Sequence, residues 1–324
     1  MKNTPKTEGI KYAGSKLKLL PHILSMVRQI KPQTVLDGFT GTTRVAQALA
    51  NCNYDVITAD HAVWSEYFGR CYLLNDKDIL YYAEIINRLN ALPGKDGWFT
   101  EKYGLAPENL NRNGLKKPWQ IHNTRKLDAI REEIDDLKLP INEKSVLITS
   151  LIRALDQVDS TLGHYSAYLK TWSPRSYQTM KMRVPKFINN DGANHDVKRG
   201  DIFEILKEIP SVDLAYFDPP YGSNNEKMPP SRVRYAAYYH IWTTICLNDH
   251  PPLMGKTFRR ADASDRVSNS AFEDFRRGVS GRFRVIEAIE RLIQEVNAKY
   301  VVFSYSSGGR ATADELNQIF RDNA

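Results

Sequence analysis

The tetrapeptide Asp-Pro-Pro-Tyr at 218–221 contains the residue types in this sequence that are best suited to chemistry. It directly follows an apolar run typical of a buried strand, and two adjacent prolines must end such a strand in a stiff turn. Pro219 and Pro220 donate no N–H, so their carbonyls remain acceptors beside the Asp218 carboxylate. Acceptors next to the Tyr221 ring favour a planar ligand with an exocyclic amine. The plain alternative is a surface turn.

Acids also stand where three other predicted strands end, at Asp37, Asp60 and Asp201. Any one of them could simply be a helix N-cap or a turn residue. Ligands of open α/β sheets bind outside the carboxyl ends of the strands, so four such acids in one chain favour a shared ligand site.

The residues around these acids indicate what the ligand is. The loop 37–43, Asp-Gly-Phe-Thr-Gly-Thr-Thr, has small residues that let the backbone approach a ligand, and it lacks the Gly-Lys-Ser/Thr of a phosphate loop. It therefore suits a cationic ligand better than a triphosphate. Asp60 could accept from ribose hydroxyls. Asp201 could accept from an adenine amine, with Ile202 or Phe203 against the ring. A nucleoside with a positive charge, such as S-adenosylmethionine, fits this pocket.

The elements that must position these residues read as an α/β fold with a parallel sheet. Strand patterns occur at 34–37, 55–60, 196–206, 212–217 and 299–307, and helical patterns at 44–53 and 283–297. Residues 61 to about 160 look mostly helical, with helices at 79–92, 127–137 and 145–158 and a polar loop at 109–123. We expect a catalytic domain from 1–60 and 190–324, and a helical insertion with recognition elements over 61–189.

Composition narrows the class of protein. The 324 residues carry a net charge of +7, which favours polyanionic partners and nucleic acid first. No apolar run approaches the roughly 20 residues of a membrane span, and the N-terminus lacks a signal peptide's apolar core. The three scattered cysteines give neither a metal-binding spacing nor a disulfide framework. These features predict a cytoplasmic protein without a metal site.

Three motifs together resemble a known family. Asp-Pro-Pro-Tyr at 218–221, the loop 37–43 and Lys-Tyr-Ala-Gly-Ser-Lys at 11–16 are similar to the Dam-like, alpha-class DNA adenine-N(6) methyltransferases. The segments 123–135 and 160–172 resemble members that accompany restriction systems. The resemblance implies a Rossmann-like, S-adenosylmethionine-dependent methyltransferase sheet that acts on double-stranded DNA with base flipping, and a possible cognate restriction endonuclease. An RNA adenine methyltransferase and a catalytically silent nucleic-acid-binding regulator remain alternatives.

The resemblance also implies roles for individual residues. Tyr12 and Lys16 would contact S-adenosylmethionine, Asp60 would hold its ribose, and Asp201 with Ile202 its adenine. The loop residues at its methionine end would be Asp37, Phe39, Thr40 and Gly41. The target adenine would be held by Asp218, Pro219, Pro220 and Tyr221, and Asp218 would also contact the cofactor. The chain departs from the family in having Gly38 where proline is usual, and in ending before the family's usual final strand pair.

DNA contacts are predicted outside the cofactor core. The basic, aromatic stretch 163–187 is the first candidate, although its aromatics could instead pack in the core. A second group of basic residues follows the tetrapeptide 218–221, and a third group lies within the basic stretch 256–284. The candidates are His164, Tyr165, Tyr168, Lys170, Arg175, Lys181 and Arg183; Lys227, Arg232 and Arg234; and Arg259 and Arg260.

Overall fold

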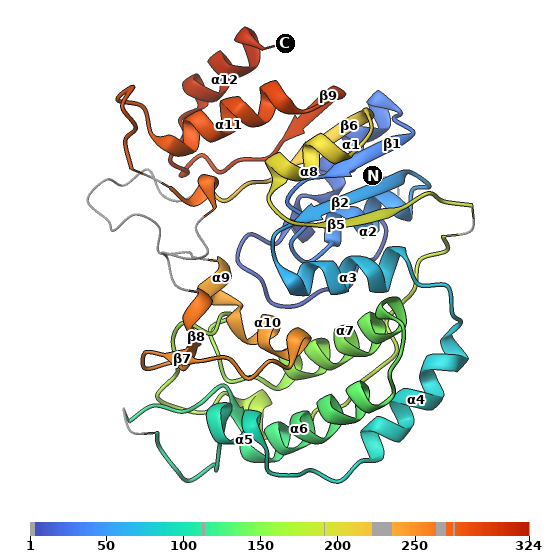
Figure 1. Ribbon diagram of the computed structural model, residues 1–324, viewed down its shortest axis with the longest axis vertical. Helices are drawn as coiled ribbons and strands as arrows, with labels where there is room; N and C mark the ends of the chain where they lie inside the picture. The colour runs from blue at the N-terminus through green and yellow to red at the C-terminus, as the bar shows by residue number, and fades with distance from the viewer. Residues whose placement is uncertain are drawn as a thin grey trace.

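Figure 1 shows the computed structural model of the chain, which describes residues 4–111, 114–190, 192–221, 235–263, 270–274 and 276–323. Among these residues, five strands form one sheet in which every neighbouring pair is parallel. In spatial order they are β5 (Asp196–Arg199), β2 (Asp55–Asp60), β1 (Thr34–Asp37), β6 (Val212–Phe217) and β9 (Ala298–Phe303). The chain runs outward from β1 in one direction and from β6 in the other, so the strand order reverses between these two central strands. Such a reversal is where open α/β sheets bind their ligands.

Both faces of the sheet are covered, which explains why its strands are nearly continuous apolar runs. Alternate side chains of each strand belong to two different cores. Val35 and Leu214 lie in a core with α1 (Leu20–Ile30), α2 (Arg44–Ala50) and α3 (Val63–Leu73). Leu36 and Ala215 lie in a second core with α8 (Ile202–Glu208), α11 (Arg284–Glu295) and α12 (Ala313–Asp322).

A helical layer packs against α3 and continues the first core. Its first part comprises α4 (Ile79–Ala91), α5 (Trp98–Tyr103), α6 (Ile121–Asp136) and α7 (Ile141–Val158). Its second part comprises α9 (Tyr235–Tyr238), α10 (His240–Leu247) and the hairpin of β7 (Leu253–Met254) and β8 (Arg259–Arg260). Figure 1 shows these two parts side by side below the sheet.

Buried contacts explain why two distant parts of the sequence share this layer. Trp242 of α10 lies 5.9 Å from Trp119 and 4.8 Å from Tyr165, between ring centroids. The fully buried Arg131 of α6 donates to the carbonyls of Ile245 and Cys246. We therefore propose that the helical unit includes 235–260, and that α3, which packs on β2 and β5 on one side and on α7 on the other, joins this unit to the sheet.

Most predicted elements occur at the predicted places, with two differences. The strand pattern at 196–206 divides into β5 and α8, because Gly200 has φ 158° and Asp201 caps the helix by accepting from the Phe203 N–H. The predicted loop 109–123 ends earlier, since the short strand β4 (Trp119–Gln120) leads directly into α6. No helix within the described ranges is long and apolar enough to cross a membrane.

Candidate active site

A pocket opens at the carboxyl ends of the central strands, and all four strand-end acids line it. Asp37 and Asp60 are the last residues of β1 and β2, while Asp218 directly follows β6. The four acids therefore line one pocket, and their role as a shared ligand site stays a prediction. The pocket is also lined by other residues that the sequence singled out: Tyr12, Lys16, Phe39, Thr40, Gly41, Ile202, Pro220 and Tyr221. Pro219 is buried and is not among the lining residues.

The glycines of the loop after β1 let it pass close to its neighbours. A Cβ at Gly38 would lie 2.4 Å from the Phe217 ring, so this position has no room for a larger residue without rearrangement. Gly41 has φ +50°, a conformation that favours glycine, and lies against the Tyr12 ring. Asp60 holds the loop in place, because its two carboxylate oxygens accept from the N–H groups of Gly41 and Ala62, each at 2.8 Å.

Asp37 is the least satisfied charged group of the pocket. Its side chain is 1% exposed, and neither carboxylate oxygen has a hydrogen-bond partner among the described residues. Burial, together with the nearby carboxylates of Asp218 and Asp60, raises the pKa of Asp37 to about 8. A buried carboxyl that lacks a partner and faces a pocket is suited to a cationic ligand.

Lys16 links the N-terminal segment to the catalytic tetrapeptide. Its ammonium lies 2.5 Å from one carboxylate oxygen of Asp218 and donates to the Tyr221 hydroxyl at 2.9 Å and the Gly14 carbonyl at 3.0 Å. The other oxygen of Asp218, Oδ1, is buried and has no partner in the part of the chain that the structure describes. Burial raises the pKa of Asp218 to about 6, and Lys16 opposes this rise. Lys16 therefore contacts Asp218 and Tyr221, to which the resemblance assigns the target adenine, whereas the resemblance gives Lys16 itself only a cofactor contact.

Aromatic residues that the sequence analysis did not select complete the pocket. The Tyr12 ring stacks on Tyr239 at 4.8 Å and lies 5.4 Å from Tyr235 and 5.6 Å from Trp64. Tyr235 and Trp64 line the pocket, as does Phe272. The aromatic-rich segment 235–242, Tyr-Ala-Ala-Tyr-Tyr-His-Ile-Trp, was the available signal, since it closely follows the tetrapeptide.

Comparison with known proteins now decides between the possible families. The family model of the D12 class N6 adenine-specific DNA methyltransferases matches residues 12–291, which include every pocket element described above. The chain belongs to this family. It is an adenine-specific DNA methyltransferase, in agreement with the resemblance that the three motifs carry.

Curated relatives of this methyltransferase agree with the family. It is 27% identical to the Type II methyltransferase M.NlaIII of Neisseria lactamica, over 95% of the chain and 87% of that protein. It is 28% identical to the modification methylase StsI of Streptococcus sanguinis and 25% identical to the Type II methyltransferase M.FokI of Planomicrobium okeanokoites. The chain spans about half the length of these last two, at 46% and 47%.

The predicted DNA-contact residues of the methyltransferase fall into two groups. Tyr165 and Tyr168 are 1% and 7% exposed, and Arg260 is 4% exposed and paired with Asp249 and Asp262. The two tyrosines are packed in the interior, so their prediction as DNA contacts is corrected; they follow the alternative reading of this stretch. Arg260 lines the pocket, and its role as a DNA contact stays a prediction. Arg175 is partly buried and forms an ion pair with Asp159, and the His164 ring stacks on the Tyr238 ring with 4.2 Å between centroids.

The second group remains available for DNA. Lys170, Lys181 and Arg183 are exposed, and Arg259 is partly exposed. Lys227, Arg232 and Arg234 lie outside the described residues. The histidine, cysteine and acidic side chains of the described ranges form no cluster that could hold a metal ion.

Proposed function

We propose that this methyltransferase acts in the cytoplasm as the modification enzyme of a restriction-modification system, with S-adenosylmethionine as methyl donor. Its acceptor is the N6 amine of an adenine that has left the duplex. One observation carries the proposal: a buried Asp218 oxygen without a partner faces the same pocket as the unpaired Asp37 carboxyl. The Asp218 oxygen is suited to accept a hydrogen bond from an amine, and the Asp37 carboxyl is suited to a cation. The printed names of the relatives, Type II methyltransferases and modification methylases, support the restriction-modification role.

The residues on the β1–β2 side fit the methyl donor. Asp37 would face its positively charged methionine end, Asp60 its ribose hydroxyls, and Asp201 with Ile202 its adenine. Asp60 and Asp201 each already accept backbone N–H bonds, but a carboxylate has further lone pairs for a ligand. When bound, S-adenosylmethionine supplies a methyl group on a sulfonium, which is already a good leaving group.

The residues on the β6 side fit the target adenine. Asp218 Oδ1 would accept one hydrogen of the N6 amine, which orients the nitrogen lone pair for in-line attack. Lys16 keeps the Asp218 carboxyl ionised and fixes its direction. Tyr221 would stack on the base. Because the chain provides no covalent nucleophile to this scheme, its contribution is positioning and electrostatic stabilisation.

The adenine must leave the duplex to reach Asp218, whose side chain is only 15% exposed. Extrusion costs a few kcal/mol of unstacking. Stacking on Tyr221 would return roughly 1–3 kcal/mol of that cost.

The proposal is tested by single-molecule sequencing of DNA from cells that express the chain, with the Asp218→Ala variant as control. We expect N6-methyladenine in one recurrent short sequence with the wild-type chain and none with the variant. Soluble, folded wild-type protein that leaves adenine unmodified in every sequence context would contradict the proposal.

A first prediction concerns protons released on cofactor binding. The pKa of Asp37 is raised to about 8, so this carboxyl is mostly protonated at pH 7. A cation beside it stabilises the ionised form, so binding of S-adenosylmethionine at pH 7 should release about one proton. Calorimetry in buffers of different ionisation enthalpy measures this number. Asp37→Asn should bind more weakly and lose the release; equal release from the variant would assign the proton to another group.

A second prediction concerns Tyr221. Tyr221→Ala should weaken binding of DNA with an extruded base by roughly 1–3 kcal/mol, because the stacking surface is lost. Binding of S-adenosylmethionine should change much less. Fluorescence of 2-aminopurine at the target position reports extrusion. Tyr221→Phe is the matched control, since it keeps the ring and removes only the hydroxyl that Lys16 contacts. Equal losses for both ligands in the alanine variant would make Tyr221 a structural residue.

A further inference from the structure

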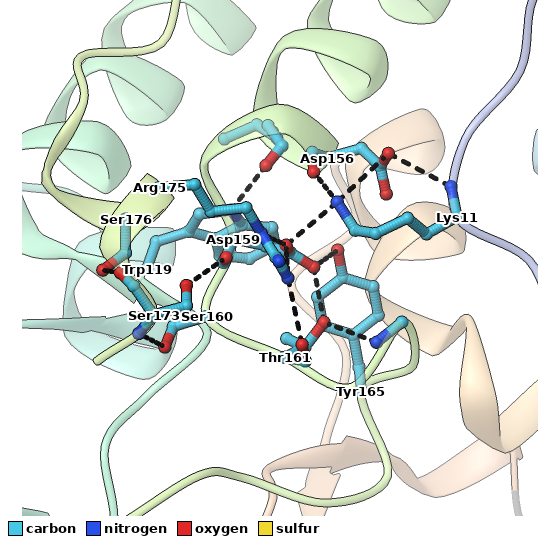
Figure 2. A network of polar contacts seen from close by, with 12 residues as sticks. Lys11, Trp119, Asp156, Asp159, Ser160, Thr161, Tyr165, Ser173, Arg175 and Ser176 are labelled. Carbon is cyan, nitrogen blue, oxygen red and sulfur yellow. Dashed lines mark hydrogen bonds and ion pairs between the residues drawn. The ribbon is translucent and has the colours of Figure 1, made fainter. Parts of the chain in front are cut away.

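A buried polar network lies outside the pocket, at the carboxyl end of α7 (Figure 2). Its centre is Asp159, which is 1% exposed. Lys11 and Arg175 approach the Asp159 carboxylate from two different segments, at 3.1 Å and 2.8 Å, and Asp156 supplies a second acid. The network thus pairs two buried acids with two bases whose side chains are 35% and 37% exposed. An isolated buried charge is costly, so the Asp159 carboxylate depends on these partners.

On one side, Asp159 holds the N-terminal segment. The Lys11 ammonium binds the carboxylates of Asp159 and Asp156 and also donates to the Asp156 carbonyl. The Lys11 backbone N–H donates to Asp156 as well, at 3.1 Å. The next residue, Tyr12, forms a wall of the cofactor pocket, and Lys16 reaches Asp218 from the same segment.

On the other side, Asp159 holds both ends of the loop 160–175. Its second carboxylate oxygen accepts from Thr161 at 2.5 Å, while Arg175 Nε donates to the first oxygen at 2.9 Å. Arg175 also donates to the Thr161 carbonyl, which closes the loop on itself. Figure 2 shows Lys11 and Arg175 approaching Asp159 from opposite sides.

This loop in turn abuts the segment that completes the pocket. The Tyr165 N–H donates to the Tyr238 carbonyl at 2.8 Å, and the Ser166 hydroxyl donates to the Ala237 carbonyl at 2.9 Å. The same helical turn begins at Tyr235, which lines the pocket beside Tyr12. Asp159 is therefore linked to the Tyr12 wall through Lys11, and to the helical turn of Tyr235 through Tyr165, whose hydroxyl donates to the Asp159 carboxylate.

We propose that Asp159 is a positioning residue for methyl transfer: it sets the Tyr12 wall through Lys11 and the Tyr235 wall through the loop closed by Arg175. The proposal rests on the function proposed above. It takes Tyr12 as a cofactor contact, as the resemblance implies, and Tyr235 as part of the target-base side, because the hydroxyls of Tyr235 and Tyr221 both lie beside Gly14. Asp159 itself touches neither ligand.

The two arms predict different defects. Lys11→Met should raise the dissociation constant for S-adenosylmethionine about tenfold, and Lys11→Arg should restore it, since it keeps the charge. Arg175→Met should raise KM for DNA about tenfold, with cofactor affinity unchanged within about twofold. Asp159→Asn should show both defects. The double variant Lys11→Met/Arg175→Met should show both defects, as Asp159→Asn does.

A control separates positioning from general stability. Asp213 lies at the start of β6, where its carboxylate binds Lys299 and accepts from the N–H groups of Gln33 and Thr34. Asp213→Asn should lower the melting temperature. It should leave the cofactor dissociation constant and KM for DNA unchanged, because Asp213 lies at the amino ends of the strands and the pocket at their carboxyl ends.

Two results would overturn the proposal. One is an unchanged cofactor dissociation constant in Lys11→Met; the other is a set of variants that melt earlier but keep wild-type constants below the transition. Failure of the proposed function is recognised separately, because the wild-type protein would then neither bind S-adenosylmethionine nor methylate adenine.

Discussion

Asp218→Ala is expected to reduce methyl transfer by at least roughly 10²–10³-fold, the usual cost of removing a preorganised group that stabilises developing charge. The amine nitrogen gains positive charge as it attacks, and Asp218 is the carboxylate placed to stabilise it. Without this side chain, the amine also loses the acceptor that directs its lone pair. Single-turnover assays with saturating DNA and S-adenosylmethionine measure the chemical step directly.

Two measurements accompany this result. Binding of S-adenosylmethionine to Asp218→Ala should stay within a few-fold of wild type, because Asp37 and Asp60 remain in place. Asp218→Asn keeps a carbonyl acceptor but loses the charge, so its rate should lie between those of alanine and wild type. Wild-type turnover by the alanine variant would remove Asp218 from the active site altogether.

The sheet was predictable because its signals are local. The apolar runs that end in Asp37, Asp60 and Asp218 became parallel neighbours, and parallel strands end at one edge. Once the strands were recognised, the convergence of their acids followed from sheet geometry alone. The loop glycines were equally readable, since Gly41 adopts a positive φ.

Contacts between distant segments were not predictable in the same way. The burial of Tyr165 and Tyr168 depends on α10 and the β7–β8 region, as seen in the Trp242 ring packed on Tyr165 and the Thr257 carbonyl that accepts from Tyr168. Nothing in the stretch 163–187 specifies these partners. A segment of aromatic and basic residues can form a DNA-binding surface, or it can bury its aromatic rings and expose only its basic side chains. Which of the two occurs depends on whether another element covers the rings.

The pairing of Lys16 with Asp218 is a further example. The sequence separates the two residues by about two hundred positions, and the motif suggested only a cofactor contact. In the structure, the Lys16 ammonium contacts both the Asp218 carboxylate and the Tyr221 hydroxyl. The cofactor-side segment thereby controls the ionisation of the adenine-side acid, which leads to a pH-dependent prediction.

Lys16→Met is expected to shift the acidic limb of the pH–rate profile toward higher pH. In the wild type, burial raises the pKa of Asp218 to about 6 and Lys16 holds it down, so activity should fall as pH drops through about 6. Removal of a cation in contact with a carboxylate raises its pKa by roughly 1–3 units. The protonated fraction of Asp218 then increases at pH 7, where the variant should be slower by roughly twofold for a shift of one unit and roughly ninetyfold for a shift of three units.

The sign of this effect makes the prediction specific. Raising the pH to 9 should restore part of the Lys16→Met rate, because Asp218 ionises again, whereas Asp218→Ala should show no such recovery. Lys16→Arg keeps the cation and should keep the acidic limb near its wild-type position. A Lys16→Met profile that is lower at every pH but has an unchanged midpoint would contradict the electrostatic role and leave Lys16 only its hydrogen bond to Tyr221.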